Sequence, residues 1–430
     1  MGVRQFRIIG AITASSLVLL GLLGCLRTSD GSPAIASPRP SQSKPISGQE
    51  RRVAQTPKTV NPQLIEANTR FGMKLFAEVL KQESNKNVFV SPSSIAIALS
   101  MAYNGANGST QQAMAKALQI QGMSLNDLNQ ANASLKALLE SADPKVQLAI
   151  ANSLWAREGV SFKPDFIQRN RQFYQAEVTD LDFRSPKAVS TINNWVKQHT
   201  RNKIDKIIDR INPDDVMFLI NAIYFKGNWT TQFDKQLTTN QPFRLSNGQQ
   251  KTVAMMSQRG DYRYYETDQF QAVNLPYGDR RVSMVIFLPK QTSNLSQFYK
   301  TLTAENWQTW SQRFRSRPGT VQIPRFKMEY DIELNQALSN LGMAEAFGRR
   351  ANFSNLSDTP MQIDQVKHKT FVEVNEEGTE AAAVTSIGIR TTSIQLDDTP
   401  FTFKADRPFF CAIRDNQTGT ILFMGAIVNP

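Results

Sequence analysis

Hydrophobic positions recur at helical spacing in the first part of the chain that looks globular. Phe71, Leu75 and Val79 repeat every four residues, which is the spacing of a helix with one buried face. A second helix is predicted to follow a short strand, because Ser91 suits an N-cap and Pro92 suits the first helical position. The Asn-Gly pair twelve residues further on predicts its end.

The same serine–proline signal recurs at residues 185–186 and predicts another helix. The side chains expected to form its buried stripe are Val189, Ile192, Trp195 and Val196.

Other patterns predict strands. Residues 215–229 are a nearly continuous apolar run, typical of a strand buried on both faces, with Asn221 in its middle. Residues 242–256 suggest a hairpin with Asn247-Gly248 as a two-residue turn. Another strand is expected over residues 281–289, and residues 401–430 predict paired strands around a polar turn. Helices early and long strands late predict one mixed α+β domain of about 365 residues.

Composition changes this picture little. The 430 residues are 40% hydrophobic and 20% charged, which is ordinary for a folded protein. Half of the net charge of +12 falls in the first 61 residues, where eight Lys and Arg face only Asp30 and Glu50. Because the remaining +6 is spread over a large body, no nucleic-acid partner is predicted.

The N-terminus has the pattern of an export signal. Arg4 and Arg7 precede an apolar run over residues 8–24 that ends at Cys25. The letters "LLGC" resemble the lipobox of bacterial lipoproteins, which implies that residues 1–25 are a signal peptide and that Cys25 becomes the lipid attachment site. Cleavage after Ala36, or an uncleaved anchor, are the alternatives.

All three alternatives export the body. We expect a cell-envelope lipoprotein or a periplasmic or extracellular protein that touches a membrane only through this N-terminal anchor. Residues 26–61 contain five prolines and six serines with few large apolar residues, which predicts a disordered tether. The only cysteines are Cys25 and Cys411, so the body is expected to contain no internal disulfide, with Cys411 as a buried apolar residue.

No catalytic or metal-binding motif is present in the sequence. The only histidines are His199 and His368, and there is no nucleophile elbow, zinc-binding histidine pair or phosphate-binding glycine loop. The sequence therefore predicts a protein that is not an enzyme and that needs no cofactor or metal.

Several stretches together resemble the serpin family, in the order in which serpins have them. They are "NVFVSPSSIAIALSMAYNGANGST", "NAIYFKGNWTTQFD", "VAMMSQRGDYRYYE", "HKTFVEVNEEGTEAAA", "FKADRPFFCAI" and the terminal "FMGAIVNP". The resemblance implies a serpin domain over residues 62–430 with a central sheet of five strands, two further sheets and about nine helices. It also implies an exposed reactive-centre loop at about residues 376–400.

The family mechanism implied by this resemblance is protease trapping. A target serine protease attacks the loop as a substrate and forms an acyl-enzyme. The cut loop then enters the central sheet as a new strand and carries the protease to the far end of the body. The residues that match the loop hinge are Glu376, Glu377, Gly378, Thr379, Glu380, Ala381, Ala382 and Ala383.

The resemblance also implies a sheet-opening switch. Ser91, Ser94, Asn221 and His368 match the polar cluster beneath the strands that must part, and Trp229 matches the tryptophan where insertion begins. For His368, a structural hydrogen-bonding role is favoured over acid–base catalysis.

The loop sequence suits insertion on physical grounds as well. A strand inside a sheet requires an apolar or small inward face and no proline. No proline occurs from Gly378 to Thr399. With Thr379 inward, this face is uncharged: Thr379, Ala381, Ala383, Thr385, Ile387 and Ile389. The outer face keeps both charges, Glu380 and Arg390. Gly378 is predicted to be a flexible pivot, and Glu376 and Glu377 to stay outside the fold.

The scissile bond is predicted from the usual family spacing of seventeen residues from Glu376. This places it between Thr392 and Ser393, which favours elastase-like or subtilisin-like proteases. The segment that follows is longer than is usual in the family. The bond between Arg390 and Thr391, which would attract a trypsin-like enzyme, is therefore the alternative.

Two other functions stay open at this level. One is a non-inhibitory serpin that binds or carries a ligand. Bulky, charged or proline residues in the hinge usually mark this group, whereas the hinge "GTEAAAVTS" has mostly small residues, no proline and a single charge, Glu380, on its outer face. The other is an exported enzyme or adhesin that shares only the fold. A monomer is expected in each case.

Overall fold

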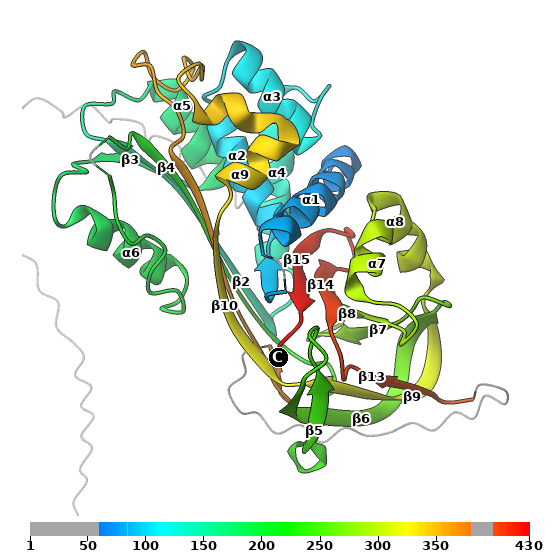
Figure 1. Cartoon of the computed structure of the whole chain (residues 1–430). Helices are drawn as coiled ribbons and strands as arrows, with labels where there is room; N and C mark the ends of the chain where they lie inside the picture. Colours follow the sequence, from blue (N-terminus) through cyan, green and yellow to red (C-terminus); the bar gives the residue numbers. More distant parts are fainter. Residues whose placement is uncertain (1–59, 84, 213, 380–398) are drawn as a thin grey trace, which may run out of the picture. The chain divides into compact units, whose positions relative to one another are not determined.

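A six-stranded sheet runs through the computed structural model, which describes residues 60–83, 85–212, 214–379 and 399–430 (Figure 1). Its strand order is β10-β11-β12-β4-β2-β3. The strands are β2 (Val146–Arg157), β3 (Glu177–Leu181), β4 (Met217–Asn228), β10 (Phe326–Glu333), β11 (Gln365–Val374) and β12 (Gly378–Thr379). The five long strands agree with the expected central sheet, and the two-residue β12 is an addition to it.

The short strand β12 pairs with two longer strands of the sheet. β11 and β4 pair directly in parallel from Gln365–Phe218 to Phe371–Tyr224. Beyond this stretch they diverge, and β12 lies between them, antiparallel to both. β12 is thus the start of a strand at the place where the two longer strands begin to separate.

The nine remaining strands are hydrogen-bonded into a second sheet system. Its order is β1-β15-β14-β8-β7-β6-β9-β13, and β5 pairs with β6. The two further sheets expected from the family share the long strand β6 (Gln250–Glu266). The other strands are β1 (Val88–Val90), β5 (Thr239–Arg244), β7 (Phe270–Pro276), β8 (Val282–Pro289), β9 (Arg315–Pro324), β13 (Phe401–Lys404), β14 (Phe409–Asp415) and β15 (Ile421–Ile427).

Nine α-helices occur within the described residues. They are α1 (Pro62–Gln82), α2 (Pro92–Tyr103), α3 (Gly108–Leu118), α4 (Leu125–Glu140), α5 (Pro164–Arg169), α6 (Ala188–His199), α7 (Leu295–Thr301), α8 (Ala304–Arg313) and α9 (Asn335–Leu338). None of the helices in the described part of the chain combines the length and apolarity needed to cross a bilayer.

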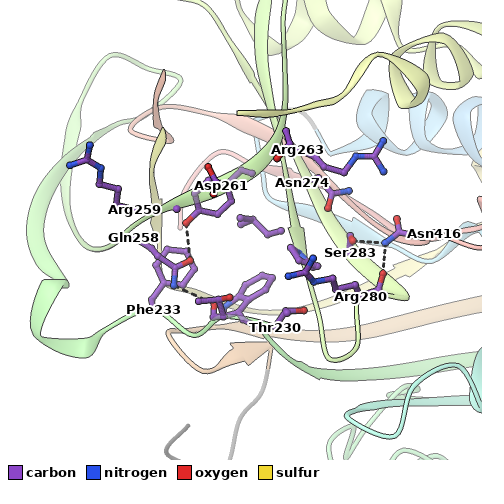
Figure 2. Close-up of a pocket in the computed structure, with 17 residues that line it drawn as sticks. Thr230, Phe233, Gln258, Arg259, Asp261, Arg263, Asn274, Arg280, Ser283 and Asn416 are labelled. Atoms are coloured by element: carbon purple, nitrogen blue, oxygen red, sulfur yellow. Dashed lines mark hydrogen bonds between the residues drawn. The ribbon is translucent and has the colours of Figure 1, made fainter. Parts of the chain in front are cut away.

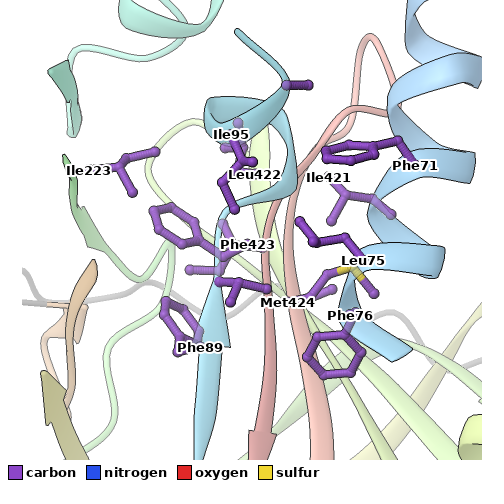
Figure 3. Packing of buried hydrophobic residues seen from close by; sticks show 14 of the residues in the cluster. Phe71, Leu75, Phe76, Phe89, Ile95, Ile223, Ile421, Leu422, Phe423 and Met424 are labelled. Carbon is purple, nitrogen blue, oxygen red and sulfur yellow. The ribbon is translucent and has the colours of Figure 1, made fainter. Parts of the chain in front are cut away.

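Helix α2 is buried on every side because nearly all of its side chains are small or apolar. Beside it, Phe71, Leu75 and Phe76 of α1 point towards β15, and Phe89 of β1 stacks on Phe423 with ring centroids 5.1 Å apart (Figure 3). A smaller apolar cluster holds Ile192 and Val196 of α6 against β4 and β2. The central sheet is therefore buried on both faces along much of β4.

Two local predictions are corrected. Helix α6 begins at Ala188 with Lys187 at the N-cap, since Ser185 forms a turn in which its carbonyl accepts from the Ala188 amide. The β5–β6 turn has Ser246 and Asn247 at its centre, because the Gly248 amide donates to the Leu245 carbonyl at 3.0 Å. Gly248 follows with φ 83°, a left-handed conformation that favours glycine.

Candidate functional site at the opening of the central sheet

The side chain of Thr379 is completely buried at the end of β12. Its backbone lies opposite Val374 of β11 on one side and Gly227 of β4 on the other. Its hydroxyl lies 2.7 Å from the hydroxyl of Tyr277, which is also buried. The predicted inward orientation of Thr379 is therefore what the structure has.

Gly378 is held in a conformation that favours glycine strongly. Its φ is 154°, and a Cβ atom built on it would lie 2.1 Å from the carbonyl oxygen of Gly227. Any other side chain would force the backbones of β12 and β4 apart. The predicted pivot is thus also a point of close backbone contact.

The position of Glu376 contradicts the prediction that it stays outside. Only 2% of the residue is exposed. Its carboxylate accepts two hydrogen bonds from Nε of Arg325, at 2.7 and 2.8 Å, and one from the Thr238 hydroxyl at 2.5 Å. The pKa of Glu376 is below its ordinary value: burial opposes ionisation, but the hydrogen bonds from Arg325 and Thr238 outweigh burial. Nη2 of Arg325 also lies 2.5 Å from the carboxylate, so the guanidinium contacts Glu376 through two nitrogens, which makes the buried carboxylate tolerable.

Glu377 is also less exposed than predicted. Its carboxylate pairs with Lys235 at 2.5 Å, and 14% of its side chain remains accessible. The preceding turn is closed by Asn375, whose side-chain oxygen accepts from the amides of Glu377 and Gly378 at 3.0 and 3.2 Å. The hinge is therefore fixed on both sides of Glu376.

Trp229 connects this turn to the rest of the fold. Its indole N–H donates to the Asn375 carbonyl at 2.9 Å, and its amide donates to the Glu377 carbonyl at 2.9 Å. Its ring stacks on Tyr277, with centroids 4.3 Å apart and planes at 11°. Trp229 thus binds the backbone of the turn that precedes β12.

A buried polar cluster joins β11 and β4 further along the sheet. Nε2 of His368 accepts from the Ser91 amide at 3.0 Å, so Nδ1 carries the ring proton and donates to the side-chain oxygen of Asn221 at 2.6 Å. The Asn221 amide group donates to the Ser94 hydroxyl and to Asn152, both at 2.5 Å. The four predicted residues are therefore brought together.

Burial lowers the pKa of His368 to about 3. Since the Ser91 amide is a donor, a second ring proton would place two donors face to face. His368 is thus a neutral hydrogen-bonding link between two strands, in line with the structural role predicted for it.

Comparison with known proteins identifies the family. Residues 66–430 match the model described as "Serpin (serine protease inhibitor)". The chain is 36% identical to human leukocyte elastase inhibitor over 382 residues, which covers 86% of this chain and all of that protein. It is 34% identical to an uncharacterized serpin-like protein of Methanosarcina mazei, covering 85% of this chain and 87% of that one.

The chain belongs to the serpin family. Its structure is similar to the native state of tengpin, a thermophilic serpin, with a TM-score of 0.80 and 34% identity, covering 87% of this chain and 96% of tengpin. The α+β serpin fold predicted from the sequence is thereby confirmed. The relatives of this serpin include proteins named as elastase inhibitors.

Sequence reasoning missed three members of the serpin site: Arg325, Thr238 and Asn152. The first two lie on segments that are 51 and 138 residues from Glu376, and nothing in their local sequence marks them. Asn152 could have been suspected, because it is an amide in an otherwise apolar stretch of β2, as Asn221 is in β4.

The remaining predicted residues lie outside the described part of the chain. They are Cys25, Glu380, Ala381, Ala382, Ala383, Arg390, Thr391, Thr392 and Ser393. The reactive bond and the lipid attachment site therefore stay predictions. Cys411 is buried, and burial raises the pKa of its thiol to about 12. In the described residues, no group of three or more His, Cys, Asp or Glu side chains could hold a metal ion.

Proposed function

We propose that this serpin inhibits a serine protease as a suicide substrate, by inserting its cleaved loop between β11 and β4. The observation that supports this most is β12 itself. Gly378 is already paired with β4 and Thr379 with both neighbouring strands, and the chain continues from Thr379 into the predicted reactive-centre loop. Further insertion requires only that the direct β11–β4 pairs be replaced by pairs to the incoming strand.

Continuing the register of β12 matches the loop to its neighbours. Each successive inward residue of the loop would lie opposite a residue two positions earlier in β11 and two positions earlier in β4. Ala381 would lie beside Phe225, and Ala383 beside Ile223, where small side chains fit between large ones. Ile387 would lie beside Val366 and Leu219, which are both apolar.

Thr385 is the polar residue among these inward positions, and it would lie at the buried polar cluster. Thr385 would lie between His368 and Asn221, which are partners across β11 and β4 before insertion. Separating these strands breaks the His368–Asn221 hydrogen bond, and a hydroxyl can both donate and accept in its place. The small, polar and apolar inward residues of the loop would thus each lie beside residues of β11 and β4 that suit them. This match supports insertion in the register that β12 begins.

Insertion would also be strongly favourable. If each new ladder hydrogen bond contributes about 1 kcal/mol, a dozen of them and the buried isoleucines would release more than about 10 kcal/mol. This is comparable to the whole stability of an ordinary domain, so the uninserted state would be a kinetic trap.

The test is incubation of the purified full chain with an elastase-like, a subtilisin-like and a trypsin-like protease. We expect a protease–serpin complex that survives denaturant, and a higher unfolding temperature after loop cleavage. Mass spectrometry of the released C-terminal fragment would then distinguish the Thr392–Ser393 bond from Arg390–Thr391. The Arg390→Ala variant should retain trapping of an elastase-like enzyme if the first bond is used.

Cleavage without a stable complex and without a rise in unfolding temperature would contradict inhibition. It would favour the non-inhibitory carrier instead, and turnover of a substrate would favour an enzyme.

We further propose that the protein is exported and held at a membrane by a lipid on Cys25. The lipobox-like sequence before Cys25 supports this proposal. In the native host, Cys25→Ala should release the protein from the membrane fraction. Unchanged fractionation of that variant would reject the anchor.

A further inference from the structure

Arg414 is a cation whose buried nitrogen has no partner in the described part of the chain. It lies on β14, at the point where the pairing with β15 shifts register between Ile413 and Arg414. Bulges of this kind commonly redirect a side chain. Its Nε is buried and hydrogen-bonds to no residue in the described ranges, and its guanidinium lies 6.0 Å from the ring centroid of Trp307.

A second arginine lines the same small cavity. Arg263 of β6 and Arg414 of β14 both border a cavity of about 50 Å³, together with the polar side chains of Asn274, Asn416 and Ser311. Its apolar lining residues are Val285, Phe287, Trp307 and Phe314. Among the described residues, no carboxylate lines it. Figure 2 shows the Arg263 side chain extending past Asn274 at the end of the neighbouring cavity where Asn416 lies.

The acidic side chains near this cavity do not neutralise its arginines. Asp415 follows Arg414 in the chain, but its carboxylate accepts from Nε of Arg281 at 2.8 Å and from the amides of Gln417 and Thr418. Asp261 lines only the neighbouring cavity. Burial lowers the pKa of Arg414 and the positive charge of Arg263 lowers it further, while the charge of Asp415 opposes these effects without cancelling them. Two cations therefore share a partly desolvated space in which no counter-ion is supplied by the described residues.

From this arrangement we propose that Arg263 and Arg414 form a clamp for a small oxyanion: phosphate, sulfate or the carboxylate of a small acid. Guanidinium groups bind such anions through paired, charge-assisted hydrogen bonds, and the side-chain amide of Asn274 is a further donor. The Asn416 amide already donates to the Arg280 carbonyl and the Ser283 hydroxyl. A cavity of this size has room for a few water-sized atoms, since one water needs about 10–15 Å³. By itself it has room for one small anionic group.

The neighbouring cavity indicates how larger acids would be accommodated. It has a volume of about 380 Å³ and shares Arg263, Asn274 and Asn416 with the small cavity. A carboxylate in the clamp could therefore carry a short substituent into the larger space. A bound oxyanion would tie β6 to β14 and would stabilise the folded chain by mass action.

Thermal unfolding of the full chain in a buffer free of phosphate and sulfate tests the clamp. Phosphate, sulfate and acetate are titrated separately against chloride at constant ionic strength. We expect a saturable rise of the unfolding temperature, superimposed on any general salt effect, and one binding site by calorimetry. The three titrations distinguish an inorganic oxyanion from a carboxylate.

Arg414→Gln and Arg263→Gln should each weaken binding of the preferred anion by at least about tenfold. Arg259→Gln is the matched control for these small anions, because Arg259 is an exposed arginine on the same strand that lines the neighbouring cavity but not the small one. If Arg414→Gln fails to fold, Arg263→Gln decides, since Arg263 is exposed and substitutions at exposed positions usually change stability little. A rise that is unsaturable, or equal in Arg263→Gln and the wild type, overturns the proposal.

Discussion

The hydroxyl groups of Thr379 and Tyr277 lie 2.7 Å apart in the interior of the protein. Tyr277 also stacks on Trp229, which donates two hydrogen bonds to the backbone of the turn before β12. The side chain of Thr379 is thus bound to the aromatic pair beside the place where β11 and β4 diverge. Substitutions at Thr379 should therefore affect insertion at its first step.

Thr379→Arg should convert the inhibitor into a substrate. The guanidinium would have to be buried beside Gly227 and Val374, without a carboxylate partner there, before the loop that follows Thr379 could be inserted. Cleavage should continue while the yield of denaturant-resistant complex falls several-fold, which gel electrophoresis measures. Thr379→Ser keeps the hydroxyl and should trap normally. Undiminished trapping by Thr379→Arg would refute the inward placement of this residue in the inserted strand.

Glu376→Ala should destabilise the native state. It removes a buried carboxylate and leaves Arg325 and Thr238 without their acceptor, but Arg325 is 45% exposed and can be hydrated. We therefore expect a loss of about 1–3 kcal/mol, seen as a lower urea midpoint. Because the pKa of Glu376 is lowered in the fold, its contribution is present above the ordinary carboxyl pKa and is lost as pH falls.

Glu377→Ala is the matched control for that change. Because the Lys235 side chain of this ion pair is exposed to solvent, the pair should contribute at most about 1 kcal/mol to the free energy of unfolding. Equal losses in the two variants would show that burial of Glu376 does not matter for stability.

Acidification should destabilise the fold through His368. The ring is protonated below about pH 6.5 in the unfolded chain, but only near pH 3 in the folded one. Between these values the unfolded state binds the additional proton, so the free energy of unfolding falls by up to about 1.4 kcal/mol per pH unit.

His368→Gln should weaken this pH dependence, measured as the unfolding temperature between pH 7.5 and pH 4. His199→Gln removes the exposed histidine and serves as the control. If both variants show the wild-type slope, His368 does not titrate as the structure indicates.

Gly378→Ala should prevent β12 from forming in its present position. The added Cβ would collide with the Gly227 carbonyl, and the φ of 154° disfavours alanine. We expect faster hydrogen exchange at the amides of Trp229 and Thr379 and a lower unfolding temperature. Gly348→Ala is the control, since Gly348 has an extended conformation and a methyl group added there would lie 3.9 Å from the carbonyl oxygen of Ala344. Unchanged exchange in Gly378→Ala would contradict the tight β12–β4 contact.

Local patterns were sufficient for most of the secondary structure. The helix over residues 62–82, the buried strand around Asn221 and the strands of the C-terminus follow from side-chain periodicity, because each buries its apolar face in one continuous core. The errors were at element boundaries, as at the start of α6 and in the β5–β6 turn. There, one or two backbone hydrogen bonds determine which residue begins the helix or lies at the centre of the turn.

By itself the sequence indicated an inward position for Thr379 and a glycine pivot at position 378, and its resemblance to serpins implied the polar set Ser91, Ser94, Asn221 and His368. Alternation, backbone freedom and polarity are properties of each residue and its near neighbours.

Only the tertiary structure decided that Glu376 is buried, because Arg325 and Thr238 come from distant segments. It also brought Arg263 and Arg414 to one cavity. The energy of a charge depends on which groups surround it in space, and local sequence does not specify those neighbours.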